Sequence, residues 1–258
     1  MSREIRKPLR RLLPHLLKAQ EDSLNEADTV QRIVMVLEEV LGYDRLTEIT
    51  REKQVKDKYV DIALKIDGVI KLLVEAKAAG TVLRDRHIEQ AKAYGAESNI
   101  RWVVLTNGVV WNLYHLSFDD GLDYERVFSV DLASDPIERA EEYLSVLHRQ
   151  SVKRGEHEQF WDKHAALDAA SIGRALYTDT VLRLVRREIR KRSRVLIDEE
   201  DLAVAIHAML CQEARDKIGV ARIRRTRSAR SGRSATATGS EEAQAPQSPA
   251  PAATTKAS

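Results

Sequence analysis

Residues 59–77 hold the feature that most limits how this chain can fold, because ionisable side chains interrupt two apolar runs. The runs YVDIALKI and IKLLVEAK flank Asp67-Gly68, a pair typical of a β-hairpin turn. Side chains alternate between the two faces of a strand. One face of this hairpin is therefore expected to carry Val60, Ile62, Leu64, Leu72, Val74 and Ala76. The opposite face is expected to carry Tyr59, Asp61, Ala63, Leu73, Glu75 and Lys77.

Pairing through the Asp67-Gly68 turn places Asp61 across from about Glu75, with Lys77 one pleat away. Two carboxylates at this distance repel each other unless a cation lies between them, and their oxygens suit Mg²⁺ or Mn²⁺. Lys77 could then orient a metal-bound water, help to deprotonate it, or stabilise charge on a phosphate during phosphodiester hydrolysis. The alternative interpretation is a half-exposed strand in which Glu75 and Lys77 form an ordinary solvated pair.

The surrounding sequence predicts the order α, three β, α, two β. Apolar residues at helical spacing predict a helix over 26–41 that ends before Gly42. Further elements are expected as strands at 45–51, 59–66 and 70–77, a helix at 84–97, and two strands within 102–116 around Asn107-Gly108. The run RVFSVDL could add an edge strand. Beyond it, residues 136–149, 156–190 and 198–215 are predicted to be helical.

Several of these motifs together resemble the PD-(D/E)XK nuclease superfamily, in particular the N-terminal nuclease domain of type I restriction enzyme R subunits. Asp61, thirteen intervening residues and then Glu75-Ala76-Lys77 match its D…ExK signature. The segments NEADTVQRIVMVLEEVLGYD, QAKAY and VVLTNGVVWNLYHL are similar to its first helix, its QxxxY motif and its terminal hairpin, so the resemblance covers about residues 20–132. It implies an α/β restriction-endonuclease-like core, a central mixed sheet flanked by helices. Val60 replaces the usual proline, and no GxxxxGK[ST] motif follows, so neither ATP binding nor a translocase is expected.

The resemblance also implies roles for individual residues. Asp61, Glu75 and the carbonyl of Ala76 would bind Mg²⁺ or Mn²⁺, and Lys77 would act on the attacking water. Glu26 would reach the metal through water; its alternative role is to stabilise a helix N-terminus as an early acid. Gln90 and Tyr94 lie one helical turn apart and would support the site or contact the DNA backbone, or else be ordinary polar residues at the edge of the core.

Composition limits the remaining possibilities. With 258 residues, 43% hydrophobic and 32% charged, the chain can bury one good core. Cys211 is the only cysteine, so neither an internal disulfide nor a thiolate-rich metal site is expected. The histidines lack HxH or HExxH spacing, so none is assigned to a metal, and Trp102 and Trp111 are expected in the core. The basic N-terminus is interrupted by Pro14 and does not resemble a signal peptide, and no long apolar window occurs, so we expect a cytoplasmic protein.

Charge and composition suggest four segments. These are a basic amphipathic helix at 1–20, the nuclease-like domain at 21–133, a helical appendix at 134–221 and a tail at 222–258. The tail holds seven Lys or Arg and two Glu, a net charge of +5, whereas the rest holds 35 basic and 38 acidic residues, a net charge of −3. Because the tail has almost no large apolar residues, we expect it to be disordered.

The leading hypothesis is a Mg²⁺-dependent DNA endonuclease with a restriction, defence or DNA-processing role. The alternatives are a non-catalytic nucleic-acid-binding or assembly protein that keeps the fold, and a nuclease that acts on RNA. The appendix could form a homodimer through its helices. Its basic run over 183–194 is either a DNA contact or the solvated face of a helix. The expected DNA-contacting residues there are Arg186, Arg187, Arg190, Lys191 and Arg192.

Overall fold

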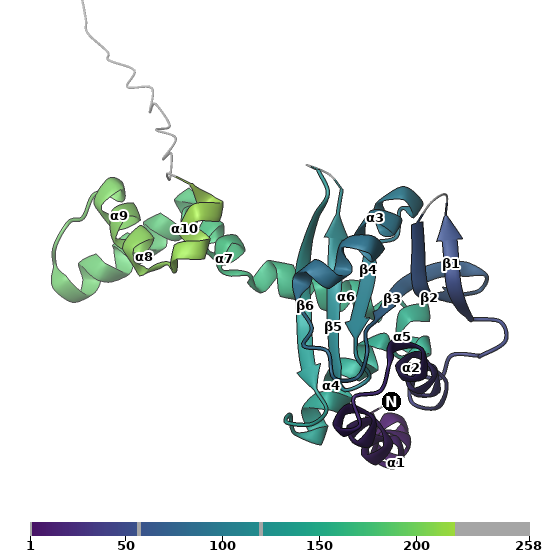
Figure 1. Ribbon diagram of the computed structural model, residues 1–258. Helices are drawn as coiled ribbons and strands as arrows, with labels where there is room; N and C mark the ends of the chain where they lie inside the picture. Colours follow the sequence, from purple (N-terminus) through teal and green to yellow (C-terminus); the bar gives the residue numbers. More distant parts are fainter. Residues whose placement is uncertain (1, 56–57, 119–120, 220–258) are drawn as a thin grey trace, which may run out of the picture. The chain divides into compact units, whose positions relative to one another are not determined.

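A computed structural model describes residues 2–55, 58–118 and 121–219, and its central feature is a mixed β-sheet (Figure 1). In the described part of the chain the sheet has six strands in the spatial order β1-β2-β3-β4-β5-β6. The strands are β1 (Ile49–Val55), β2 (Lys58–Ile66), β3 (Val69–Ala76), β4 (Trp102–Thr106), β5 (Val110–Ser117) and β6 (Asp123–Asp131). Neighbouring strands are antiparallel except β3 and β4, which are parallel. The predicted α/β class, with a central mixed sheet flanked by helices, is confirmed.

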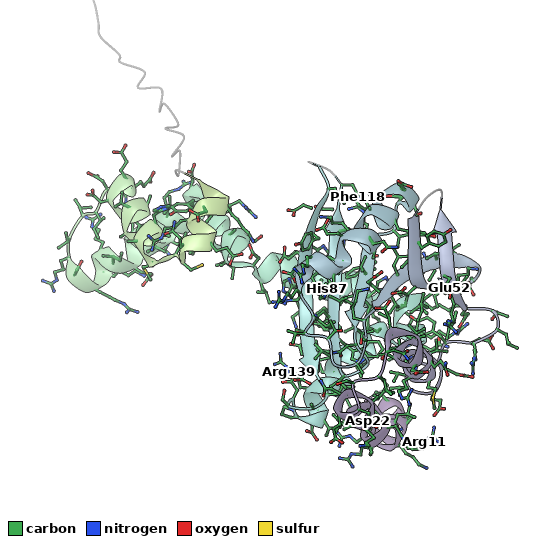
Figure 2. All side chains as sticks on the ribbon, viewed as in Figure 1. Arg11, Asp22, Glu52, His87, Phe118 and Arg139 are labelled. Atoms are coloured by element: carbon green, nitrogen blue, oxygen red, sulfur yellow. The ribbon has the colours of Figure 1, made fainter. Side chains whose placement is uncertain are left out.

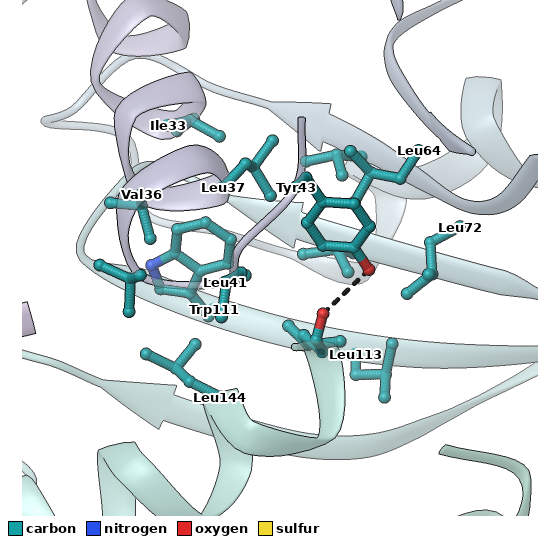
Figure 3. Packing of buried hydrophobic residues seen from close by; sticks show 14 of the residues in the cluster. Ile33, Val36, Leu37, Leu41, Tyr43, Leu64, Leu72, Trp111, Leu113 and Leu144 are labelled. Carbon is teal, nitrogen blue, oxygen red and sulfur yellow. Dashed lines mark hydrogen bonds between the residues drawn. The ribbon is translucent and has the colours of Figure 1, made fainter. Parts of the chain in front are cut away.

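The two faces of the sheet are covered by different helices. One core cluster joins the sheet to α1 (Ser2–Glu21), α2 (Glu26–Glu39) and α4 (Ile137–Leu147). Within it, Trp111 and Tyr43 are fully buried, and the Tyr43 hydroxyl donates a hydrogen bond to the Leu147 carbonyl at 2.9 Å (Figure 3). On the other face, α3 (Glu89–Ser98) contributes Ala91 and Tyr94 to a second cluster. Trp102 is buried as well, so both of these tryptophans lie in the core as predicted.

The parallel pairing of β3 and β4 requires a crossover, and the 3₁₀ helix η1 (Asp85–Ile88) and α3 provide it. The crossover ends at Asn99, which adopts the left-handed conformation that stops α3. At the other end of the domain, α2 begins at Asn25, whose side-chain oxygen accepts a hydrogen bond from the Asp28 amide. This cap fixes Glu26 as the first residue of the helix.

The hairpin of β2 and β3 contains an irregularity that sets its register. Near the turn Lys65 pairs with Ile70, but the next pair is Leu64 with Leu72, so Lys71 has no partner in the register. Simple counting back from Asp67-Gly68 would place Asp61 opposite Val74. The extra residue shifts the pairs to Ile62 with Val74, and continuing that register places Asp61 opposite Glu75. The carboxylates therefore share a face because of the bulge.

Two local expectations for these strands are wrong. First, β1 begins at Ile49 and not at 45, because the Asp44 side chain accepts hydrogen bonds from the Leu46 and Thr47 amides and forms a turn. Second, Val60 packs in the second cluster with Ala63, whereas Ile62 lies in the first. Regular alternation therefore fails at this position. In the neighbouring strand β1, Glu52, which is labelled in Figure 2, leaves extended geometry with a φ of 48°. The β1–β2 register passes from Arg51 with Ile62 to Lys53 with Val60, so Glu52 and Asp61 are the residues between these two pairs.

The C-terminal region is helical, as predicted, but more finely divided. It contains α5 (Arg149–Lys153), α6 (Glu156–Leu167), α7 (Ala169–Leu176), α8 (Asp179–Ser193), α9 (Glu199–Met209) and α10 (Gln212–Ile218). The expected continuous helix over 156–190 is wrong, because Asp168 leaves helical geometry with ψ 142° and caps the Ala170 amide. A second break follows at Thr178. Leu182, Leu202 and Ile206 form a separate small cluster that joins α8 to α9.

None of the helices in the ranges that the structure describes is long and apolar enough to span a bilayer. The predicted tail at 222–258 lies outside those ranges.

Candidate active site

The D…ExK residues meet where β3 ends. Asp61 lies in β2, Glu75 and Ala76 are the last residues of β3, and Lys77 follows directly. The Lys77 amide donates to the Thr106 carbonyl at 2.9 Å, so pairing with β4 continues through Lys77. One Asp61 carboxylate oxygen accepts a hydrogen bond from the Ala76 amide at 2.7 Å. This bond holds the Asp61 carboxylate against the end of the neighbouring strand.

The Lys77 ammonium is surrounded by oxygen atoms. Its Nζ lies 2.6 Å from Glu75 Oε1 and 2.9 Å from the Ala76 carbonyl oxygen. Glu26 Oε2 lies 3.9 Å from the same Nζ, so the first turn of α2 reaches the site from a different element. Three of the predicted site residues, Glu75, Ala76 and Glu26, thus contribute oxygen atoms around the Lys77 ammonium, and Asp61 adds its charge to that of this group.

Burial sets the charge balance of this cluster. Glu75 is only 4% exposed, and burial, followed by the charge of Asp61, raises the pKa of its carboxyl to about 7. Burial disfavours the charged form of Lys77, but its hydrogen bond to Glu75 and the surrounding acids outweigh this effect and raise its pKa. Glu75 Oε2 is buried and has no hydrogen-bond partner among the described residues. A buried carboxylate oxygen without a partner is costly, and the charge of Asp61 adds to that cost.

The donor atoms suit a hard divalent cation. Asp61, Glu75 and the Ala76 carbonyl offer only oxygen, and the unsatisfied Glu75 Oε2 could serve as a ligand. Within the described ranges, no group of three or more His, Cys, Asp or Glu residues is arranged to hold a metal. Two carboxylates and one carbonyl would leave the remaining coordination positions to water, which is common for Mg²⁺.

The two residues of the QxxxY motif serve different structural purposes. Gln90 is exposed, and its Nε2 donates to the Tyr59 carbonyl at 2.9 Å, two residues before Asp61. Tyr94 is buried in the second core cluster beneath the sheet. Gln90 therefore ties the start of α3 to β2 near the acidic cluster, while Tyr94 packs α3 on the sheet.

A residue that the sequence did not single out joins the two sides of the site. Thr29 is buried, and its Oγ1 donates to the Asn25 carbonyl at 2.7 Å and accepts from the Ala79 amide at 3.0 Å. It therefore links the turn that carries Glu26 to the segment after Lys77. The sequence signal for this role is a threonine on an otherwise apolar helix face, three positions after Glu26. Asn107 has a similar role, because its Nδ2 donates to the Thr81 carbonyl.

The basic run predicted to contact DNA lies on α8, where its members differ in their contacts. Arg186 donates to the Ile197 carbonyl and pairs with Glu199 at 2.8 Å. Lys191 pairs with Glu188 at 2.8 Å, whereas Arg187 lies 3.9 Å from the same carboxylate.

Comparison with known proteins adds independent information on the same part of the chain. Residues 25–127 match the family model described as Type I restriction enzyme R protein N terminus (HSDR_N). A search of curated proteins gives no significant match. Among solved structures, the chain matches the type IIG restriction endonuclease BpuSI at 16% identity with a TM-score of 0.32. That match covers 71% of this chain and 23% of the other, so the chain spans about a quarter of that enzyme's length.

The family match encloses the whole acidic cluster and its lysine, from Glu26 to Lys77. Residues 25–127 are therefore related to the N-terminal region of type I restriction enzyme R proteins.

Proposed function

We propose that this protein is a divalent-metal-dependent DNA endonuclease with a role in restriction, defence or DNA processing. The observation that carries the proposal is the convergence of Asp61, Glu75 and Lys77 at the end of β3, with Glu26 beside them. This cluster lies within the segment related to restriction enzymes. A surface salt bridge would not require a carboxylate that is 4% exposed with one oxygen unpaired.

Each residue has a distinct part in the proposed site. Asp61, Glu75 and the Ala76 carbonyl would hold Mg²⁺ or Mn²⁺. When bound, the metal would supply Lewis-acid stabilisation of phosphate charge and a water of lowered pKa. Lys77 is charged in this arrangement, so it would orient the attacking water and stabilise negative charge rather than accept a proton. Glu26, from the first turn of α2, would reach the metal through a water molecule, and Gln90 would keep α3 close to β2.

The main alternative is a non-catalytic nucleic-acid-binding or assembly protein that keeps the fold. The combination of a buried Glu75, a partly buried Asp61 and a partly buried Lys77 favours the enzyme, because such a cluster costs stability unless it is used.

The decisive experiment incubates purified protein with supercoiled plasmid DNA in Mg²⁺, Mn²⁺ or EDTA. We expect nicking or linearisation with either metal and none in EDTA. Asp61→Asn should abolish both cleavage and Mn²⁺ binding measured by calorimetry, because a metal ligand is lost. Lys77→Ala should abolish cleavage while Mn²⁺ still binds, and the lost positive charge should raise the affinity for the metal.

Two residues of the same hairpin provide matched controls. Asp67 lies at the turn and Lys71 is exposed on β3, both away from the acidic cluster. Asp67→Asn and Lys71→Ala should keep cleavage and Mn²⁺ binding. If the wild-type protein binds no divalent metal and cuts neither DNA nor RNA, yet binds DNA, then the non-catalytic alternative is correct. Cleavage of RNA but not DNA would instead show that the protein is a nuclease that acts on RNA.

A further inference from the structure

Helix α8 carries a row of arginines on one side. Arg183, Arg187 and Arg190 are spaced by four and three residues, which places them within about 60° of the helix circumference. Arg194, the C-cap residue with a left-handed backbone, continues the same spacing. All four side chains are exposed. We call these four residues the α8 arginine row.

The basic side chains of α8 differ in their contacts, and Arg183 Nε donates to the Asp179 carbonyl of the same helix at 3.0 Å. Arg186, next to the row, is held by Glu199 and by the Ile197 carbonyl, so it links α8 to the start of α9. Arg190 and Arg194 make no side-chain hydrogen bond or ion pair with any residue that the structure describes. Arg187 lies 3.9 Å from Glu188, and both side chains are more than half exposed, so this pair contributes little.

The row contributes nothing evident to folding. The buried residue of α8 is Leu182, which packs with Leu202 and Ile206 of α9 on another side of the helix. Like charges at this spacing repel and destabilise an isolated helix by a few tenths of a kcal/mol per pair. Arg183 makes one hydrogen bond within its own helix, and Arg187, Arg190 and Arg194 are exposed and at most weakly paired. Such a row of guanidinium groups is therefore a binding surface for an anion or a feature without a structural purpose.

We propose that the α8 arginine row binds the phosphate backbone of duplex DNA without reading its sequence. This inference rests on the proposed nuclease function, for which DNA is the substrate. From Arg183 to Arg190 the helix rises about 10 Å, which equals about three steps of 3.4 Å along the duplex axis, the axial rise per phosphate of one strand. Guanidinium groups bind phosphate oxygens in a bidentate manner, which suits this contact.

An anionic membrane surface is the competing partner for a basic helix, but the structure disfavours it. Membrane-bound amphipathic helices insert an apolar face beside their basic face. In α8 most of that apolar face is occupied, since Leu182, Val185 and Ile189 pack in the cluster shared with α9, and Leu184 is the large apolar side chain of this helix that stays exposed. Three residues of the row, together with the phosphate spacing, therefore point to a nucleic acid backbone.

Two double variants of the full chain separate the row from general charge. Arg187→Gln with Arg190→Gln removes two charges from the row, and Lys191→Gln with Arg192→Gln removes two charges from the same helix outside it. Binding to a fluorescent duplex of about three helical turns is measured by anisotropy in EDTA, between about 50 and 200 mM NaCl. All substituted side chains are exposed, so thermal unfolding should show equal midpoints and confirm folding.

The row variant should bind about tenfold more weakly, and its slope of log affinity against log salt should become shallower by about 2, one unit for each lost phosphate contact. The control variant should keep the wild-type slope. Equal losses in both variants, or no loss in either, would overturn the inference. So would wild-type binding to phosphatidylserine vesicles but not to the duplex. Because the assay contains no metal, its outcome is independent of whether the plasmid is cut.

Discussion

At the residue scale, Lys77 compensates the charge of the acidic cluster only in part. Its Nζ contacts one oxygen of Glu75 and the Ala76 carbonyl, while the other Glu75 oxygen stays unpaired. Burial, followed by the charge of Asp61, raises the pKa of Glu75 by more than this contact with Lys77 lowers it. A second cation would complete the compensation. The motif residues could be identified from spacing alone, but this imbalance depends on burial and on Asp61, which only the structure reveals.

His157 provides a residue-scale prediction away from that cluster. It is 4% exposed beside Trp102, its Nε2 lies 3.5 Å from Glu158, and Nδ1 has no hydrogen-bond partner among the described residues. Burial, which Glu158 only partly offsets and Lys71 reinforces, lowers the pKa of the imidazole below 6.5. In the unfolded chain His157 takes up a proton at about pH 6.5. The folded state resists that proton, so stability is complete above this pH and falls as the pH decreases towards the folded-state pKa.

The measurement is thermal unfolding of the wild type and of His157→Gln from about pH 8 to pH 5. Relative to the variant, the wild-type midpoint should be steady at the upper end of this range and decrease below about pH 6.5, because the variant lacks the titrating imidazole and shares every other titrating group, Glu75 included. The difference between the two unfolding midpoints above pH 7 is the reference, since His157 of the wild type is neutral there in both the folded and the unfolded state. An equally steep decrease in the variant would show that His157 does not cause the acid sensitivity.

At the element scale, the β2–β3 hairpin depends on its single extra residue. Lys71 is exposed and unpaired in the register, so its side chain has no evident role in the hairpin. Its presence in the chain, however, sets the register that places Asp61 opposite Glu75. In the same register Ile62 pairs with Val74, and both pack in the first core cluster. A one-residue slip reverses the face of every side chain beyond it.

We therefore expect deletion of Lys71 and Lys71→Ala to differ sharply. The substitution should change the free energy of unfolding by less than about 0.5 kcal/mol, as for most exposed sites. The deletion removes the bulge and forces either a polar face into the core or a broken hairpin, so it should destabilise by several kcal/mol and leave the protein largely unfolded. Denaturant unfolding followed by circular dichroism measures both. A stable deletion variant that still cleaves DNA would mean that the register is not set at Lys71.

The elements differ in how far the sequence predicts them. The helix beginning at Glu26, the two hairpins around Asp67-Gly68 and Asn107-Gly108, and the edge strand β6 follow from local periodicity and turn residues. The bulge at Lys71 and the positive φ at Glu52 do not, because Lys and Glu carry no local preference for either geometry. The breaks at Asp168 and Thr178 lie in a polar, weakly periodic segment, where capping by Asp168 competes with helix continuation.

On the scale of the whole molecule, burial is distributed unevenly along the chain. β4 is buried along its full length, and β3 and β5 are buried over most of theirs, because helices cover both faces of the sheet. By contrast, α8 and α9 share a cluster with three buried residues, and several large apolar side chains nearby are exposed: Leu184, Leu196, Val204 and Met209. The boundaries predicted at residues 133 and 221 remain predictions, but the core of the described chain is concentrated before α7.

Local opening should therefore be much easier in α8 and α9 than in the sheet. Opening exposes the apolar side chains that an element buries, so an element with few of them opens at a lower free energy than global unfolding requires. Hydrogen–deuterium exchange of the full-length protein, followed by mass spectrometry, should show peptides from β4 and β5 exchanging at least about tenfold more slowly than peptides from α8 and α9. Helix α2, whose face towards the sheet is buried in the larger core, is the matched helical control and should be protected like the strands. If α8 and α9 exchanged as slowly as β4, these helices would open only with the rest of the molecule, which would require a contact for their exposed apolar side chains.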